Sequence, residues 1–178
     1  MKKIMLLSAI ALTVLSLAAC SAAKPDDTKA NEKVITNSDT KESKANWDEA
    51  SKTFTSEKVI IKIDKIAIDK DYDNRSFVKI YYTLTNKQSN AEQVSFLIQD
   101  SMKVQQESKN TSNDLSPLSI TPDENGNIEE THLDDNIKPE GTISGYYPLL
   151  LENNSDPINI LFQNNDTSLF ATYKVQIN

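Results

Sequence analysis

One residue in the sequence combines a reactive side chain with a diagnostic position, and that residue is Cys20. It is the only cysteine in the chain and directly follows Leu17, Ala18 and Ala19. A thiolate is nucleophilic enough near neutral pH to form a thioether, and a lone cysteine cannot form an internal disulfide. The small side chains of Ala18 and Ala19 leave the backbone accessible to a peptidase. We therefore expect modification of the Cys20 thiol and signal cleavage between Ala19 and Cys20.

The segment before Cys20 has the layout of a secretory signal peptide. Two lysines, at positions 2 and 3, precede an apolar run from residue 4 to residue 19. A helix of roughly 16 residues spans about 24 Å, which is shorter than the ~30 Å hydrocarbon core of a membrane. With Leu17 to Cys20, this layout resembles the bacterial lipobox. The resemblance implies that residues 1–19 are a lipoprotein signal peptide and that a diacylglyceryl group on Cys20 anchors the chain to the cell membrane on its extracytoplasmic side.

Residues 20–46 are predicted to be the lipidated Cys20 and a disordered tether. The segment is rich in Lys, Asp, Thr, Ser, Asn and Ala, and Val34 and Ile35 are its only pair of large apolar residues. Such a segment buries too little apolar surface to offset the chain entropy lost on ordering. A flexible coil of about 25 residues spans at most about 85 Å, so the domain that follows would stay close to the membrane.

The charge of the chain excludes some classes of partner. The formal net charge is −7, and loss of the two positive charges of Lys2 and Lys3 leaves −9. This balance argues against a nucleic-acid partner, a polybasic membrane contact and tight ionic binding to anionic wall polymers. The chain has only three glycines, which excludes glycine-rich phosphate-binding loops. We predict no cofactor.

Residues 57–178 carry the alternating apolar pattern of half-buried β-strands. The predicted inward positions are Val59, Ile61, Ile63, Ile66, Ile68, Val78, Ile80, Tyr82, Leu84, Val94, Phe96, Ile98, Ile143, Tyr147, Leu149, Ile158, Ile160, Phe162, Leu169, Ala171, Tyr173, Val175 and Ile177. A change of parity near Asp64 and Lys65 predicts a bulge or a switch of face, and Pro148 predicts an edge strand or a break. About seven short strands without a long helix predict an all-β, antiparallel β-sandwich.

Residues 47–56 have two interpretations. Asn46 and Glu49 have the spacing of a capping box at the start of a helix. Trp47, Ala50 and Phe54 would then share one helix face. The segment predicts either a short helix that docks through Trp47 or a lead-in to the first strand.

Several local sequences resemble a known family. They are the acidic turn with Tyr72 before the strand at 78–84, Thr85-Asn86-Lys87, Val94-Ser95-Phe96, Gln99-Asp100-Ser101, and Ile137-Lys138-Pro139-Glu140-Gly141-Thr142 before a tyrosine-containing strand. Over roughly residues 56–178 they resemble the domain of unknown function 5067 family, found in lipoproteins of low-GC Gram-positive bacteria. The resemblance implies an immunoglobulin-like, telokin-like sandwich at the cell surface. It offers no catalytic residues. Ser101 and Glu140 depart from the family's turn patterns.

Candidate chemistry in the predicted domain is sparse. His132, the only histidine, would need Asp134 or Asp135 to orient it as a general base, and the mature chain offers neither a cysteine nucleophile nor a Gly-x-Ser-x-Gly motif. The acidic stretch 123–130 is rich in calcium-type ligands, but its glycine falls at position four of an EF-hand loop instead of position six. Tyr81, Tyr146, Tyr147 and Trp47 are candidates to line a sugar-binding or peptide-binding face.

The sequence therefore predicts a membrane-anchored extracellular lipoprotein that is not an enzyme. Its sandwich would bind a cell-surface protein or a wall component. The alternatives are an envelope-directed hydrolase that uses His132 with nearby carboxylates, and a structural module steadied by calcium. We predict no catalytic residues and no metal ligands. The predicted site residues are Cys20, for lipidation, and Ala19 with Cys20, for signal cleavage.

Overall fold

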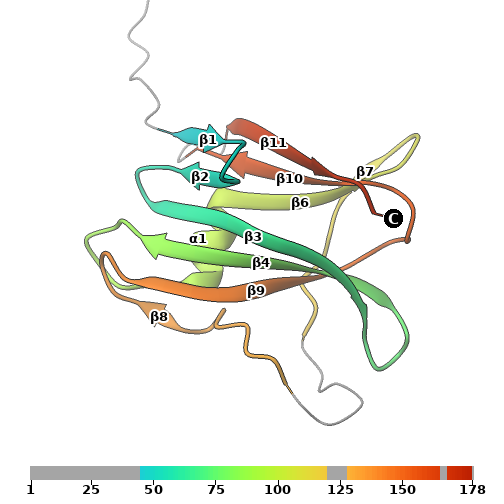
Figure 1. The fold of residues 1–178 in the computed structure, drawn as a ribbon, viewed down its shortest axis with the longest axis horizontal. Coiled ribbons are helices and arrows are strands. Elements are labelled where there is room, and N and C mark those ends of the chain that lie inside the picture. The colour runs from blue at the N-terminus through green and yellow to red at the C-terminus, as the bar shows by residue number, and fades with distance from the viewer. Residues whose placement is uncertain (1–44, 120–127, 165–167, 178) are drawn as a thin grey trace, which may run out of the picture. The chain divides into compact units, whose positions relative to one another are not determined.

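The computed structural model describes residues 45–119, 128–164 and 168–177. The predicted signal peptide at residues 1–19, Cys20 and the predicted tether as far as residue 44 lie outside the described residues. The described residues belong to one compact unit, Asp39–Asn178. They form two antiparallel sheets and a separate two-stranded pair (Figure 1). The predicted all-β sandwich is confirmed.

The larger sheet has five strands in the order β1-β2-β3-β4-β9. Their bounds are β1 Asn46–Asp48, β2 Thr53–Thr55, β3 Val59–Lys70, β4 Ser76–Asn86 and β9 Thr142–Leu150. The register of β3 on β4 shifts between Ile63 and Lys65, so the predicted bulge is confirmed. β9 lies at the edge of this sheet, where a proline such as Pro148 is tolerated.

The smaller sheet has four strands in the order β11-β10-β6-β7. Its strands are β6 Met102–Glu107, β7 Ser112–Asp114, β10 Ile158–Gln163 and β11 Leu169–Val175. The strands β5 Glu92–Gln93 and β8 Asn136–Ile137 form the separate pair, and the helix α1 Val94–Ser101 leads from β5 to β6. In Figure 1, α1 lies behind the five-stranded sheet.

One hydrophobic core includes residues of both sheets and of α1. Its largest fully buried side chains are Tyr82, Phe54, Phe162, Ile61, Ile80, Leu84, Leu97, Ile98, Leu149, Ile158 and Ile160. On β10, buried residues alternate with half-buried ones, as the sequence predicts. The chain after β7 closes one side of this core, because the Leu118 N–H donates to the Pro148 carbonyl at 3.0 Å and the Leu150 N–H donates to the Ser116 carbonyl at 2.9 Å.

The strand predicted from Val94, Phe96 and Ile98 is wrong, because these residues form α1. The helix buries Val94, Leu97, Ile98 and Ser101, which are spaced as i, i+3, i+4 and i+7. Phe96 points away from the core, and its side chain is 55% exposed.

The helix predicted around Trp47 is also wrong. Residues 46–55 form the β1–β2 hairpin, in which Trp47 lies opposite Phe54. The lead-in interpretation is closer to the structure, because β2 pairs directly with β3. Two of the predicted inward positions are wrong, because Leu169 is 60% exposed and Ile68 is 41% exposed, whereas Ile177 is buried as predicted.

Candidate functional site

His132 lies in the chain before β8, where the structure pairs it with one of its two predicted carboxylates. Its Nδ1 atom is 2.8 Å from Asp135 Oδ2, and its Nε2 atom is 3.5 Å from Glu130 Oε2. Asp134 instead accepts a hydrogen bond from Gln93 Nε2 at 3.0 Å. The imidazole is one-third exposed, and the backbone of His132 has a positive φ of 58°. Asp135 therefore orients the His132 ring, as general-base catalysis requires, and the ring is partly open to solvent.

The segment that carries His132 is fixed by close contacts with the core. The Tyr82 hydroxyl donates a hydrogen bond to the Thr131 carbonyl at 2.8 Å. A Cβ atom on Gly145 would lie 2.2 Å from that same carbonyl oxygen, so only glycine permits this approach. The N–H groups of Val94 and Ser95, at the start of α1, donate to the carbonyls of Asp135 and Leu133. Backbone carbonyls of the segment around His132 therefore cap the N-terminus of α1, in place of a side-chain cap.

A charged cluster lies on the outer face of the five-stranded sheet. The Lys79 ammonium is 2.9 Å from Asp69 Oδ2 and 3.2 Å from Glu129 Oε2. Burial alone would lower the pKa of Lys79, but the hydrogen bonds to Asp69 and Glu129 outweigh it, so that its pKa lies above the ordinary value. The hydrogen bond from Lys79 is the largest cause of a lowered pKa at Asp69.

Two tyrosines border this cluster. The rings of Tyr81 and Tyr146 lie 5.6 Å apart, and the Lys79 Nζ atom is 5.2 Å from the centroid of the Tyr146 ring. Burial raises the pKa of both phenols. Tyr147 points the other way, into the core. The aromatic face predicted from Tyr81, Tyr146, Tyr147 and Trp47 therefore does not form, because these side chains lie in three different places.

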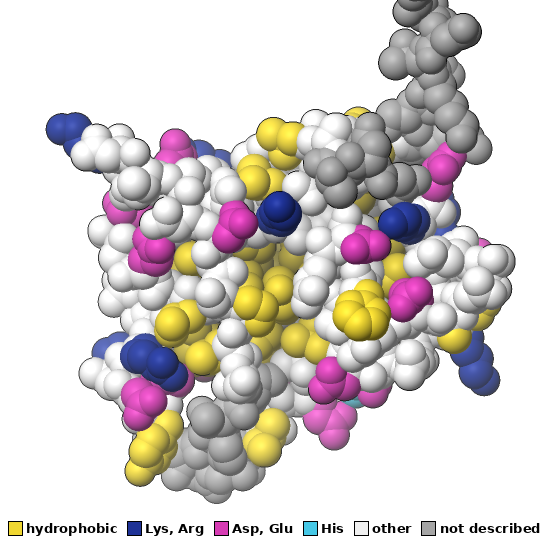
Figure 2. Space-filling view, turned by 180° about the vertical axis from the view of Figure 1, so that it is seen from behind, with side chains coloured by type: hydrophobic (Ala, Val, Ile, Leu, Met, Phe, Trp, Pro, Cys, Tyr) yellow, Lys and Arg dark blue, Asp and Glu magenta, His cyan; other side chains and the backbone are white. Residues whose placement is uncertain are grey.

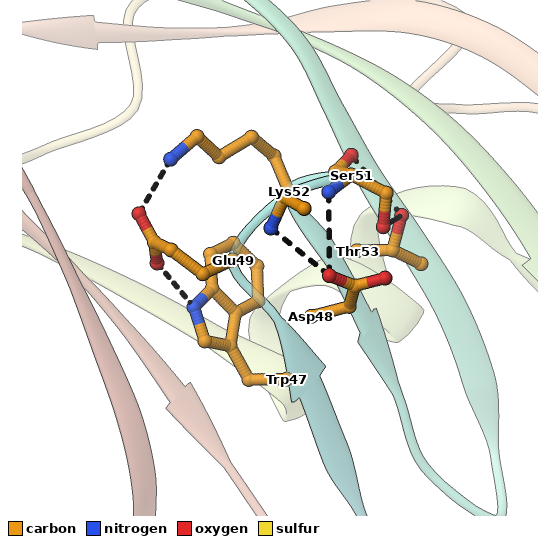
Figure 3. A network of polar contacts seen from close by, with 7 residues as sticks. Trp47, Asp48, Glu49, Ser51, Lys52 and Thr53 are labelled. Carbon is orange, nitrogen blue, oxygen red and sulfur yellow. Dashed lines mark hydrogen bonds and ion pairs between the residues drawn. The ribbon is translucent and has the colours of Figure 1, made fainter.

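Trp47 belongs to a second aromatic cluster. Its ring stacks on Phe162 with centroids 4.7 Å apart and lies 5.7 Å from the Tyr173 ring. The indole N–H donates to Glu49 Oε2 at 2.7 Å, and the other oxygen of Glu49 accepts from Lys52 Nζ (Figure 3). Hydrogen bonds from Lys52 and from Trp47 lower the pKa of Glu49. Trp47 thus closes one side of the aromatic core and is held there by a surface network.

The face that carries α1 has an apolar centre. Figure 2, which views the molecule from behind relative to Figure 1, shows hydrophobic side chains gathered in the middle of this face with charged groups around them. The helix α1 lies behind the five-stranded sheet in Figure 1, and Phe96 on this helix is 55% exposed. Contiguous exposed apolar surface of this kind marks interaction sites more often than isolated hydrophobic residues do.

Some sequence predictions fall outside the described residues. Cys20 is one, and most of the acidic stretch 123–130 is another, so both stay predictions. Within residues 45–119, 128–164 and 168–177, no group of three or more His, Cys, Asp or Glu side chains is arranged to hold a metal ion. Among the helices in those ranges, none is long and apolar enough to cross a membrane.

Comparisons with solved structures place this antiparallel sandwich among known folds. One similar structure is that of a protein described as a "putative lipoprotein from Staphylococcus aureus subsp. aureus NCTC 8325". It matches with a TM-score of 0.65 and 18% identity, over 76% of this chain and 93% of the other. A protein from Enterococcus faecalis, solved by NMR, matches with a TM-score of 0.63 and 20% identity, over 75% of this chain and 94% of the other. At these identities the likeness shows the fold alone.

The family follows from the sequence comparison. The model of the domain of unknown function DUF5067 matches residues 23–164, so the chain belongs to this family. The resemblance noted from the turn and strand sequences is thereby confirmed. The comparison with curated proteins found no match.

Sequence reasoning missed the exposed position of Phe96 and the pairing of Lys79 with Asp69 and Glu129. Neither has a local signal, because each depends on which chain segments meet in the fold.

Proposed function

We propose that this chain is a lipid-anchored protein on the extracytoplasmic side of the cell membrane, where its sandwich acts as a non-enzymatic binding module. Four features support the proposal: the position of Cys20, the apolar segment before it, membership of a family of unknown function, and the likeness to the staphylococcal protein. The partner is a cell-surface protein or a wall component that presents an apolar surface.

The observation that carries this proposal is the exposure of Phe96. Its neighbours Leu97 and Ile98 are 1% and 0% exposed, whereas Phe96 is 55% exposed. A large aromatic side chain loses little conformational entropy when a partner covers it and contributes strongly to interface energy. The helix that presents Phe96 is held firmly, because its other apolar side chains are packed in the core.

The test is cross-linking in cells with tagged wild type and the variants Cys20→Ala and Phe96→Ser, followed by mass spectrometry of captured proteins. We expect a partner that is captured by wild type and lost with Phe96→Ser. The matched control is Tyr72→Ser, because Tyr72 is 87% exposed and lies on the β3–β4 turn, away from α1. Two outcomes would show that α1 is not the contact face. One is an equal loss of capture with Tyr72→Ser, and the other is a set of captured proteins that neither Phe96→Ser nor Tyr72→Ser alters.

The hydrolase alternative rests on one observation, the 2.8 Å contact between His132 Nδ1 and Asp135 Oδ2. An oriented imidazole of this kind can remove a proton from water or from a hydroxyl group. The test is release of fragments from isolated envelope by the wild type and by His132→Gln and Asp135→Asn. Activity that survives both substitutions, or no activity in the wild type, would end this alternative.

A further inference from the structure

Strand β1 pairs with the domain through Asn46–Asp48, and Ala45 before it also packs against the core. The strand pairs with β2 alone, through Asn46 with Thr55, Trp47 with Phe54 and Asp48 with Thr53. The Trp47 ring adds its contacts with Phe162 and Tyr173. β1 lies at the edge of its sheet, so its departure would break no other strand pair. A second copy of the same three residues would make the same contacts.

The connection from β1 to β2 is short and includes an unfavourable backbone conformation. It consists of residues 49–52, and Lys52 has a φ of 55°. This left-handed region costs a residue with a Cβ atom roughly 1–2 kcal/mol relative to the right-handed one. The Lys52 carbonyl accepts a hydrogen bond from the Ile63 N–H at 2.9 Å. The turn is further held by Asp48, whose carboxylate accepts from the Ala50 N–H at 2.9 Å (Figure 3).

We propose that β1 exchanges between two copies of this chain, so that Asn46–Asp48 of one copy pairs with β2 of the other. Trp47 would then stack on Phe162 and Tyr173 of the second copy. The pairing of β1 with β2 and the ring contacts of Trp47 are conserved in the exchange. The connection opens, which breaks the hydrogen bonds of the Asp48 carboxylate with the turn and releases Lys52 from its left-handed conformation. A short, strained connection next to a separable edge element is the arrangement that favours domain swapping. The inference goes beyond the proposed binding function and does not depend on it.

The test uses the full chain in cells and the register of the hairpin. Two forms are expressed together, Asn46→Cys with one tag and Thr55→Cys with another, and are treated with a short membrane-permeable bismaleimide. Positions 46 and 55 lie directly opposite each other in the β1–β2 pair, so exchange brings the two thiols together between chains. We expect a covalent product that carries both tags and that is reduced when Trp47→Ala is added to the Asn46→Cys form.

Three controls make the outcome decisive. A single chain with both Asn46→Cys and Thr55→Cys must cross-link within itself, which shows that the reagent spans the two positions. Wild type, whose only cysteine is Cys20, gives the background. Asn46→Cys expressed with Asp114→Cys gives the collision rate, because Asp114 is exposed on β7 and has no β1 partner. A two-tag product no stronger than this last pair would overturn the inference.

The connection supplies a second, independent readout. Lys52→Ala and Lys52→Gly both remove the contacts of the ammonium group, but only glycine relieves the positive φ. Relative to Lys52→Ala, we expect Lys52→Gly to stabilise the closed form and to lower the two-tag product by at least about five-fold. Equal yields from the two variants would mean that the conformation of Lys52 does not drive an exchange.

Discussion

The hydroxyl of Tyr82 lies 2.8 Å from the carbonyl oxygen of Thr131, a residue 49 positions further along the chain. This bond joins the middle of β4 to the segment that caps α1. Burial raises the pKa of the Tyr82 phenol, and the negative charge of Asp135 adds to this effect. The neutral, donating form of Tyr82 is therefore the one that the fold stabilises.

Replacing Tyr82 by Phe would test this bond with little change of shape. The Thr131 carbonyl would lose its donor, and an unsatisfied acceptor at a partly buried site costs about 1–2 kcal/mol. We expect the free energy of unfolding to fall by that amount in urea denaturation of the purified protein. Tyr81→Phe is the matched control, since Tyr81 lies on the outer face and bonds only weakly, at 3.3 Å, to Glu129. An equal loss in both variants would contradict the assigned role.

Gly145 is required by the same contact. A Cβ atom there would meet the Thr131 carbonyl oxygen at 2.2 Å and the Tyr82 hydroxyl oxygen at 2.8 Å. Because one of these is backbone, the chain would have to shift, and overpacking of this kind costs about 1–3 kcal/mol. We expect Gly145→Ala to lower the melting temperature clearly in a thermal scan, whereas Ser144→Ala, one residue earlier on the outer face, should change it little.

Glu140 adopts an unfavourable backbone conformation, with a φ of 56°. It occupies the turn between Pro139 and Gly141, where the Gly141 N–H donates to the Lys138 carbonyl at 2.9 Å. Glycine adopts a positive φ without steric cost, so Glu140→Gly should raise the free energy of unfolding by up to about 1 kcal/mol. Glu140→Ala removes the carboxylate but keeps the strain, and it should bring no such gain. A stabilising alanine variant would point to charge instead of backbone strain.

The strands of the core were predictable where one face of a strand meets the core along its whole length. β4 and β10 are such strands, and every apolar residue that their alternation places inside is buried, although Phe77 of β4 is buried as well. The bulge near Lys65 was predictable as well, because a change of face leaves a change of parity in the apolar residues. The Lys79 cluster was not predictable, because Asp69, Lys79 and Glu129 come together only when the outer face of the sheet meets the chain before β8.

The two errors in secondary structure have a common cause. Val94 and Ile98 fit a strand period and a helix period equally well, so only Phe96 and Leu97 distinguish the two, and both are apolar. Trp47 and Phe54 likewise share a side in a hairpin or in a helix. The capping pattern of Asn46 and Glu49 was misleading, because the Glu49 carboxylate binds the Trp47 indole and Lys52 instead of a helix N-terminus.

The Lys79 cluster should make the stability depend on pH at both ends of the range. Folding raises the pKa of Lys79 above 10.5, so its contribution is present below pH 10.5 and is lost as the pH rises further. Folding lowers the pKa of Asp69 below 3.8, so that contribution is lost as the pH falls below 3.8. We expect the difference in unfolding free energy between wild type and Lys79→Met to be largest from roughly pH 5 to pH 9. Lys103→Met, at an exposed site on β6, should show a difference that does not vary with pH.

Substitutions at two neighbouring residues of α1 test whether this segment is a helix or a strand. In the helix, Leu97 is 1% exposed and Phe96 is 55% exposed, whereas a strand would place Phe96 inside and Leu97 outside. Truncation of a buried leucine leaves a cavity and costs about 2–5 kcal/mol. We therefore expect Leu97→Ala to lower the free energy of unfolding by that amount and Phe96→Ala to change it by less than about 0.5 kcal/mol. Urea denaturation of the two variants measures both values, and a larger loss at Phe96 than at Leu97 would mean that the segment is a strand.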